Sequence, residues 1–264
     1  NYIGQELMVN ALEQASSDEK VKAVVLRVNS PGGSALASDL IWRAMELTKA
    51  EKPLVVSMGD LAASGGYYIA CNADKIVAEP TTITGSIGVF GMLPNVSQLT
   101  DKMGIYSEKV ATNDPASYSP FHPIDASFYT LTKEGVDNIY KTFVGKVAKG
   151  RNMTFEEVHE VAQGRVWSGT QALEQGLVDE LGGLDRAVAL AASLADVTTY
   201  KVKNYPSYEK ELSEVLESMP FMNTKEGLLK QWVGDANFSL FQKIHNLRNV
   251  QGIQARMPFV LDIN

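Results

Sequence analysis

Two glycine-rich turns hold the residues of this sequence that are best suited to chemistry. The first is Ser-Pro-Gly-Gly over residues 30–33, and the second is Ala-Ala-Ser-Gly-Gly over residues 62–66. Each follows a run of apolar residues typical of a buried strand and precedes a segment with helical spacing. Parallel α/β sheets place their sites at the carboxyl ends of strands, so we expect both turns to lie at one site.

The chemistry that these turns favour is acyl transfer with Ser64 as the nucleophile. Attack on a peptide carbonyl needs a nucleophile, a base and N–H donors directed at the oxygen that becomes negatively charged. We predict that the backbone N–H groups of Gly33 and Gly65 are these donors, since glycine lets other groups approach the backbone closely. Their neighbours Gly32 and Gly66 are expected to line the site.

Ser64 and the glycines also have simpler explanations. A serine before glycine at the start of a helix is often only an N-cap. A Gly-Gly pair after a strand could instead bind phosphate, but neither Gly-Lys-Ser/Thr nor Gly-x-Gly-x-x-Gly follows here. The spacing alone therefore leaves open whether Ser64 is catalytic or structural.

The base is harder to identify than the nucleophile. The chain has three histidines, of which His159 lies in a charged helical run typical of a solvated surface and His245 lies in the C-terminal tail. Only His122, in a proline-rich loop, is placed where it could approach a site. These positions disfavour a Ser-His-Asp triad without excluding it.

The composition excludes several other classes of function. The chain has 264 residues, a net charge of −7 and no basic stripe, so we expect no nucleic-acid partner. The single cysteine, Cys71, allows neither an intrachain disulfide nor a cysteine cluster for a metal, and we expect it to be a small buried residue. We predict no metal and no cofactor.

The sequence contains neither a signal peptide nor an apolar stretch of about 18 residues or more. It opens at Asn1 rather than at a methionine, which is typical of a piece of a longer protein. We therefore expect any membrane association to occur through a segment outside this chain.

The elements that must position the two turns alternate between strand and helix. This alternation predicts an α/β fold with right-handed βαβ units and a mostly parallel sheet. The expected strands are residues 21–28, 53–58, 75–78, 105–110 and 199–202, with a turn over 59–63. The expected helices are residues 5–17, 35–50, 64–71, 94–103, 130–149, 154–162, 169–175 and 184–196.

Two segments depart from this alternation. Residues 111–127 contain three prolines and no periodicity, and a long loop of this kind is usually functional or mobile. Residues 204–264 form a less regular tail, with expected helices over 208–218 and 225–247. We therefore divide the chain into a domain over residues 1–203 and a helical tail over 204–264.

A set of linked motifs occurs in unbroken order over about residues 1–200. They are Asn-Ser-Pro-Gly-Gly-Ser (29–34), Ala-Ala-Ser-Gly-Gly-Tyr-Tyr (62–68), Thr-Gly-Ser-Ile-Gly-Val (84–89), Gly-Arg-Val-Trp-Ser-Gly (164–169) and Ala-Leu-Glu-Gln-Gly-Leu-Val-Asp-Glu-Leu-Gly-Gly (172–183). Together they resemble the signal peptide peptidase A family, also called protease IV. The first two alone would also resemble the Clp protease subunit, which uses a histidine, and the later motifs decide between the two families.

The resemblance implies a Clp/crotonase-like fold over residues 1–203 and a serine endopeptidase with a Ser-Lys dyad. It places the nucleophile at Ser64 and the oxyanion donors at Gly33 and Gly65, with Ser86 near the site, where it helps to orient the lysine. It also implies a homo-oligomer, a tetramer, that degrades cleaved signal peptides and other peptides at the bacterial inner membrane, on the periplasmic side.

The chain departs from the family in one respect. Short members carry the lysine base in the loop after the strand that corresponds to residues 105–110, but here Pro115 occupies the matching position and Lys109 is too early. Long members are tandem duplications in which the N-terminal half has the lysine and the C-terminal half has the serine. This chain resembles such a C-terminal half, so we expect the N-terminal half of the same protein to be its partner and the fragment alone to be inactive.

Two other functions remain open from the sequence. A crotonase-type acyl-CoA enzyme shares the oxyanion-hole fold but would need acidic bases where this chain has Ser64 and Ser86. A non-catalytic half-domain that only supports an assembly would also explain the missing base. Residues Gly65, Ile87 and Val89 would give a site for small or apolar side chains.

Overall fold

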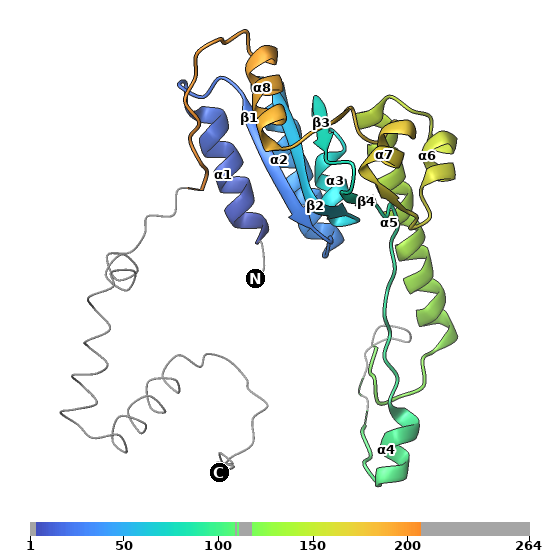
Figure 1. Cartoon of the computed structure of the whole chain (residues 1–264). Helices are drawn as coiled ribbons and strands as arrows, with labels where there is room; N and C mark the ends of the chain where they lie inside the picture. The colour runs from blue at the N-terminus through green and yellow to red at the C-terminus, as the bar shows by residue number, and fades with distance from the viewer. Residues whose placement is uncertain (1–3, 109, 111–117, 207–264) are drawn as a thin grey trace, which may run out of the picture. The chain divides into compact units, whose positions relative to one another are not determined.

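The computed structural model describes residues 4–108, 110 and 118–206, which form eight helices and six strands (Figure 1). The strands are β1 (Val24–Ser30), β2 (Leu54–Ala63), β3 (Lys75–Ala78), β4 (Ile83–Gly85), β5 (Val166–Ser168) and β6 (Glu180–Leu181). The helices are α1 (Gln5–Ser17), α2 (Ala35–Glu51), α3 (Gly65–Ala70), α4 (Ser97–Met103), α5 (Ala126–Arg151), α6 (Phe155–Val161), α7 (Gly169–Glu174) and α8 (Leu184–Leu194).

The strands form one sheet that is parallel except at one edge. β1 pairs with β2, β2 pairs with both β3 and β4, and β3 pairs with β6, all in parallel. Only the pair of β4 and β5 is antiparallel. This mixed, mostly parallel sheet with intervening helices confirms the predicted α/β fold class.

Strand β2 is longer than predicted, and its extension holds the site. Its first half pairs with β3 and its second half, residues 61–63, pairs with β4. The Thr84 hydroxyl donates a hydrogen bond to the Ala62 carbonyl at 2.7 Å. The prediction of a turn over residues 59–63 was therefore wrong, because β4 supplies a backbone partner that is not visible in the local Gly-Asp pattern.

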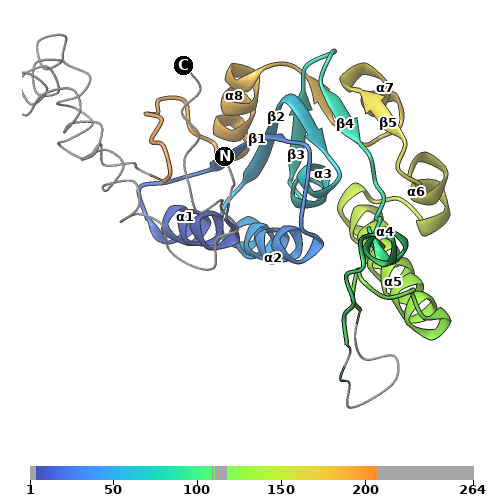
Figure 2. The same cartoon turned by 90° about the horizontal axis from the view of Figure 1, so that it is seen from below.

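Helices cover both faces of the sheet, which explains the nearly continuous apolar sequence of β2. Figure 2 shows α1, α2 and α3 below the sheet and α8 above it. Val56 and Met58 belong to the larger core, which includes residues of α2, α3 and α5, while Val55 packs with residues of α8. Cys71 is fully buried in the larger core, as predicted, and burial raises the pKa of its thiol to about 12.

Capping side chains set where α2 and α5, the two helices beside the site, begin. Ser34 caps α2 by accepting a hydrogen bond from the Ala37 N–H at 3.3 Å. α5 begins at Ala126, earlier than predicted, because the Asp125 carboxylate accepts hydrogen bonds from the N–H groups of Ser127 and Phe128.

Several other expectations need correction. The described residues of 105–110 form no strand, and residues 199–202 are not paired in the sheet. The short strands β5 and β6 were not predicted, because two or three residues are too few to show a period. The boundary at residue 203 stays a prediction, and the helices expected over 208–218 and 225–247 lie outside the described residues.

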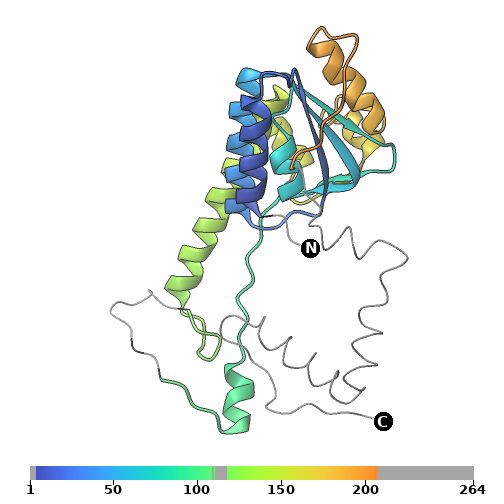
Figure 3. The same ribbon diagram turned by 90° about the vertical axis from the view of Figure 1, so that its left-hand side faces the viewer.

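One part of the described chain exposes many apolar side chains. Figures 1 and 3 show α4 and the beginning of α5 away from the sheet. We call residues 90–106 and 118–131 the apolar arm. Its exposed apolar side chains are Phe90, Met92, Leu99, Met103, Ile105, Tyr106, Phe121, Tyr129 and Leu131. Within the described ranges, no helix has both the length and the apolar character needed to cross a bilayer.

Candidate active site

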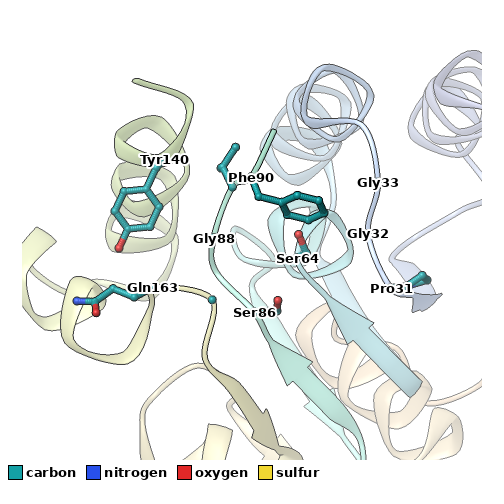
Figure 4. A pocket seen from close by; sticks show the side chains of 11 residues that line it. Pro31, Gly32, Gly33, Ser64, Ser86, Gly88, Phe90, Tyr140 and Gln163 are labelled. Carbon is teal, nitrogen blue, oxygen red and sulfur yellow. The ribbon is translucent and has the colours of Figure 1, made fainter. Parts of the chain in front are cut away.

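A cleft of about 730 Å³ lies where the two glycine turns meet the end of β4 (Figure 4). It is lined by Pro31, Gly32, Gly33, Ser64, Ser86, Gly88, Val89, Phe90, Tyr140, Gln163 and Gly164. The structure thus brings together four of the predicted site residues, which come from the ends of β1, β2 and β4. This is the carboxyl edge of the parallel strands, where the sequence placed the site.

Ser64 stands between β2 and α3 in an unusual backbone conformation. Its φ of 53° and ψ of −119° are costly for a residue with a side chain. The conformation is held on both sides, since the Ser64 N–H donates to the Gly85 carbonyl at 2.9 Å and the Tyr68 N–H donates to the Ser64 carbonyl at 2.8 Å. The Ser64 side chain makes no capping hydrogen bond, so its hydroxyl is available to the cleft.

The two glycine turns touch each other through their backbones. A Cβ on Gly32, whose φ is 96°, would lie 2.5 Å from the Gly65 nitrogen and 2.8 Å from the Ser64 Cβ. A Cβ on Gly65 would lie 3.1 Å from the Gly33 nitrogen and 2.5 Å from the Ser38 Oγ. Only glycine fits this approach, and it brings the peptide groups of Gly33 and Gly65 next to Ser64.

The N–H groups near Ser64 differ in their hydrogen bonding. The Gly32 N–H donates to the Ser30 Oγ at 3.2 Å. In the described part of the chain, the N–H groups of Gly33 and Gly65 have no acceptor. Gly65 is half-buried and Gly33 is exposed, so without an acceptor in the described residues both donors are available to a ligand.

Ser86 lies beside Ser64 in the cleft, directly after β4 (Figure 4). Its φ is 49°, and its N–H donates to the Arg165 carbonyl at 2.7 Å. Gly66 does not line the cleft as expected, because it packs against β1, where a Cβ would lie 2.7 Å from the Ser30 carbonyl oxygen. Ile87 is likewise fully buried, so it does not form the apolar lining that the sequence suggested.

The sequence does not predict the far wall of the cleft. Figure 4 shows Tyr140 of α5 and Gln163 on the side opposite the glycine turns. The Tyr140 hydroxyl shares a hydrogen bond with His159 Nδ1 at 2.7 Å, and Gln163 Nε2 lies 3.1 Å from His159 Nε2. His159 is therefore held by two neighbours and is not the freely solvated side chain that its sequence suggested. Partial burial raises the pKa of the Tyr140 hydroxyl. No local pattern links residues 140 and 163 to Ser64.

The described residues that line the cleft include no lysine, histidine, aspartate or glutamate. His122 shares a hydrogen bond with the Ser107 Oγ at 3.1 Å and is not part of the lining. Lys109, Pro115 and His245 lie outside the described residues. Among those that the structure describes, no group of three His, Cys, Asp or Glu could hold a metal ion. The described part of the cleft thus offers the Ser64 hydroxyl and two N–H donors, but no lysine, histidine or carboxylate to act as its base.

Comparison with known proteins agrees with this geometry. The profile of peptidase family S49 matches residues 46–198, and that of the Clp protease family matches residues 4–83. The first match spans more than half of the chain and includes Ser64 and Ser86. The second spans both glycine turns, so it accounts for the fold around them.

Three curated relatives share the sequence over most of this chain. Protease 4 of Haemophilus influenzae is 39% identical over 238 residues, which are 88% of this chain and 38% of the relative. Protease 4 of Salmonella typhi is 41% identical over 218 residues, 82% of this chain and 35% of the relative. The chloroplastic serine protease SPPA of Arabidopsis thaliana is 36% identical over 261 residues, 97% of this chain and 37% of the relative. The chain thus spans little more than a third of their length, and it belongs to peptidase family S49, a family of serine proteases.

Proposed function

We propose that this chain supplies the nucleophile and the oxyanion hole of a serine endopeptidase. One observation carries the proposal: the Ser64 hydroxyl, which makes no capping hydrogen bond, lies in a cleft beside the N–H groups of Gly33 and Gly65, which have no acceptor among the described residues. Ser64 Oγ attacks the carbonyl carbon of a peptide bond, and its proton passes to a base. The carbonyl oxygen becomes an oxyanion, which accepts hydrogen bonds from the two N–H groups.

The base comes from outside this chain, as a lysine of a homologous N-terminal half of the same protein. Two facts support this step: the described lining of the cleft has no lysine, histidine, aspartate or glutamate, and the chain spans only 35–38% of the three relatives. The lysine has to be neutral to accept a proton, and burial at an interface lowers a lysine pKa by several units. Ser86, beside Ser64, would help to orient it.

The apolar arm supports association with such a half or with further copies of the chain. Exposed side chains of this size are costly in water, and patches of them mark protein interfaces or membrane contacts. The substrates are cleaved signal peptides and other peptides, which the motif resemblance suggests and the relatives' protease names support. The expected place of action is the periplasmic side of the bacterial inner membrane, in a homo-oligomer such as a tetramer.

The test measures hydrolysis of a fluorogenic peptide by this chain, by the lysine-bearing N-terminal half and by their mixture. We expect turnover only in the mixture, and its loss in the mixture when Ser64→Ala is introduced. Ser193→Ala, an exposed serine of α8, is the matched control and should leave turnover unchanged. Turnover by this chain alone would show that no external base is needed, and turnover with Ser64→Ala would remove Ser64 as the nucleophile.

The same samples separate the peptidase from the other two functions. A fluorophosphonate probe should label Ser64 in the mixture. A crotonase-type enzyme would instead turn over an acyl-CoA thioester without labelling, but the described cleft lining lacks the acidic residues for that chemistry. A purely structural half-domain would show neither reaction, even in the full-length protein.

A further inference from the structure

The two predicted oxyanion donors lie at the N-terminal ends of two different helices, one just before its helix and one at the first position. The Gly33 N–H lies in the turn that leads into α2, and Gly65 is the first residue of α3. A pair of donors stabilises an oxyanion only if their separation is maintained, and a shift of about 1 Å can cost about 100-fold in rate. Whatever fixes α3 against α2 therefore also sets the geometry of the proposed oxyanion hole.

A polar cluster joins these helices one to two turns from the donors. The Tyr68 hydroxyl of α3 donates a hydrogen bond to Asp39 Oδ1 of α2 at 2.6 Å. Lys146 of α5 forms an ion pair with the same carboxylate oxygen. The Lys146 ammonium also lies 3.6 Å from the centre of the Trp42 ring and 5.3 Å from the centre of the Tyr68 ring. Three helices thus meet at one carboxylate.

The cluster is well placed to control the donors. Tyr68 is three residues after Gly65, and Asp39 is six residues after Gly33. Both intervals lie largely within helices, which are stiff over such short lengths at about 1.5 Å per residue. Tyr68 is buried and the Lys146 side chain is 18% exposed, whereas the Asp39 side chain that accepts from both is 44% exposed, so these two side chains are shielded from water and the carboxylate is only partly shielded.

The charges of the cluster keep the hydrogen bond in one direction. Burial raises the pKa of Tyr68, and so does its hydrogen bond to Asp39, so the phenol remains a donor. Burial opposes ionisation of Asp39, but the hydrogen bonds from Lys146 and Tyr68 outweigh it and lower the pKa of this carboxyl. At neutral pH the donor and the acceptor are therefore both in the required state.

We propose that Tyr68 is a positioning residue: through Asp39, with Lys146, it fixes the Gly65 donor relative to the Gly33 donor. This inference rests on the proposed function, because it assumes that these two N–H groups bind the oxyanion. Tyr68 does not line the cleft, so its effect on the reaction is transmitted through the backbone of α3.

The same helix offers a matched control. Tyr67 is also buried and its hydroxyl also donates a hydrogen bond, at 2.8 Å, but the acceptor is the Leu177 carbonyl rather than a residue of α2. Tyr67→Phe and Tyr68→Phe each remove one buried hydroxyl from α3. Only Tyr68→Phe breaks the link between the two donors.

The experiment measures kcat and KM of the full-length protein for a peptide substrate, and its affinity for a peptide boronic acid that forms a tetrahedral adduct with the nucleophile. For Tyr68→Phe we expect kcat to fall roughly 10- to 100-fold, KM to change less than about twofold, and boronate affinity to fall in parallel with kcat. Tyr67→Phe should keep both kcat and boronate affinity within about threefold of the wild type. Asp39→Asn, which keeps an acceptor for Tyr68 but removes the ion pair, should be intermediate.

The outcomes distinguish the inference from the proposed function. Full activity of Ser64→Ala would overturn the proposed function and this inference with it. If Ser64→Ala is inactive but Tyr68→Phe has the wild-type kcat, only the positioning role is wrong. Equal losses in Tyr67→Phe and Tyr68→Phe would reduce Tyr68 to a structural role. If circular dichroism shows that Tyr68→Phe does not fold, the same comparison is made with Asp39→Asn, and a wild-type boronate affinity would then overturn the inference.

Discussion

At the scale of single residues, the site depends on backbone conformations that the rest of the fold stabilises. The positive φ of Ser64 costs about 1–3 kcal/mol by itself. Hydrogen bonds with Gly85 and Tyr68 offset this cost, and Gly32 passes so close that no side chain fits there. The strained conformation is therefore held by three segments: the turn after β1, the end of β4 and helix α3.

Gly32→Ala tests this arrangement directly. Its Cβ would lie 2.5 Å from the Gly65 nitrogen, so the glycine turns have to separate, and kcat of the full-length protein should fall about 100-fold or more. Gly145→Ala in α5 is the control, because nothing lies within 4 Å of its added Cβ; it should keep kcat and gain about 0.5–1 kcal/mol of stability. Steady-state kinetics and urea unfolding check both variants. A wild-type kcat in Gly32→Ala would contradict the proposed contact.

At the scale of elements, β2 serves two parts of the sheet. Its first half forms the centre with β1 and β3, and its second half extends to β4, which delivers Ser86 to the cleft. The end of α5 is attached to β3 through Asp179. This carboxylate accepts hydrogen bonds from the Ile76 N–H and from Arg151, both at 2.8 Å. Since α5 also holds Tyr140, this attachment places the far wall of the cleft.

Asp179→Asn should therefore lower the free energy of unfolding by about 3 kcal/mol at pH 7, because it leaves the Arg151 guanidinium, 8% exposed, without its counter-charge. Burial raises the pKa of Asp179, but the hydrogen bond and charge of Arg151 outweigh it, and the net pKa is lowered. A lowered carboxyl pKa stabilises the fold above the unfolded value of about 3.9, and this contribution is lost as the pH falls through the folded pKa. The difference between wild type and variant should thus be constant above about pH 5 and shrink below pH 4.

Urea unfolding between pH 3 and pH 8 measures this difference. Asp185→Asn, an exposed acid in the first turn of α8, is the control and should cost no more than about 1 kcal/mol. A difference for Asp179→Asn that grew toward low pH would contradict the assigned sign of its pKa shift.

At the scale of the whole molecule, the described structure has an incomplete site and an exposed apolar arm. Under the proposed function, one partner that brings the base and covers the arm would explain both features. Leu99 and Met103 of α4 are 57% and 64% exposed, so these apolar side chains do not pack into the core. The arm starts at Phe90 in the cleft, so a partner on it would also reach the site.

Leu99→Glu combined with Met103→Glu should therefore weaken assembly without unfolding the chain. We expect at least a tenfold loss of hydrolysis in the mixture with the lysine-bearing half at limiting concentrations, recovered at higher concentration, because each buried carboxylate opposes association by more than about 1 kcal/mol. Leu184→Glu with Leu194→Glu on α8 changes two exposed leucines, 44% and 40% exposed, far from the arm and is the control. Sedimentation and thermal unfolding check assembly and folding separately. Unchanged sedimentation and hydrolysis in the α4 variant would show that the arm is not the interface.

The sequence by itself determined the features that depend on neighbours along the chain. The alternation of apolar strands and amphipathic helices predicted the α/β fold, the glycine turns predicted that Ser64, Gly33 and Gly65 lie close together, and Cys71 was correctly placed in the core. These signals are local, because helix period, strand period and turn residues act over only a few positions.

Only the tertiary structure decided the features that depend on distant residues. It extended β2 through the predicted turn by pairing it with β4, and it brought Tyr140 and Gln163 to the cleft wall opposite Ser64. It also turned Ile87 and Gly66 away from the cleft. Such contacts form because packing and backbone hydrogen bonds are satisfied between segments separated by tens of residues, and no local pattern records which segments will meet.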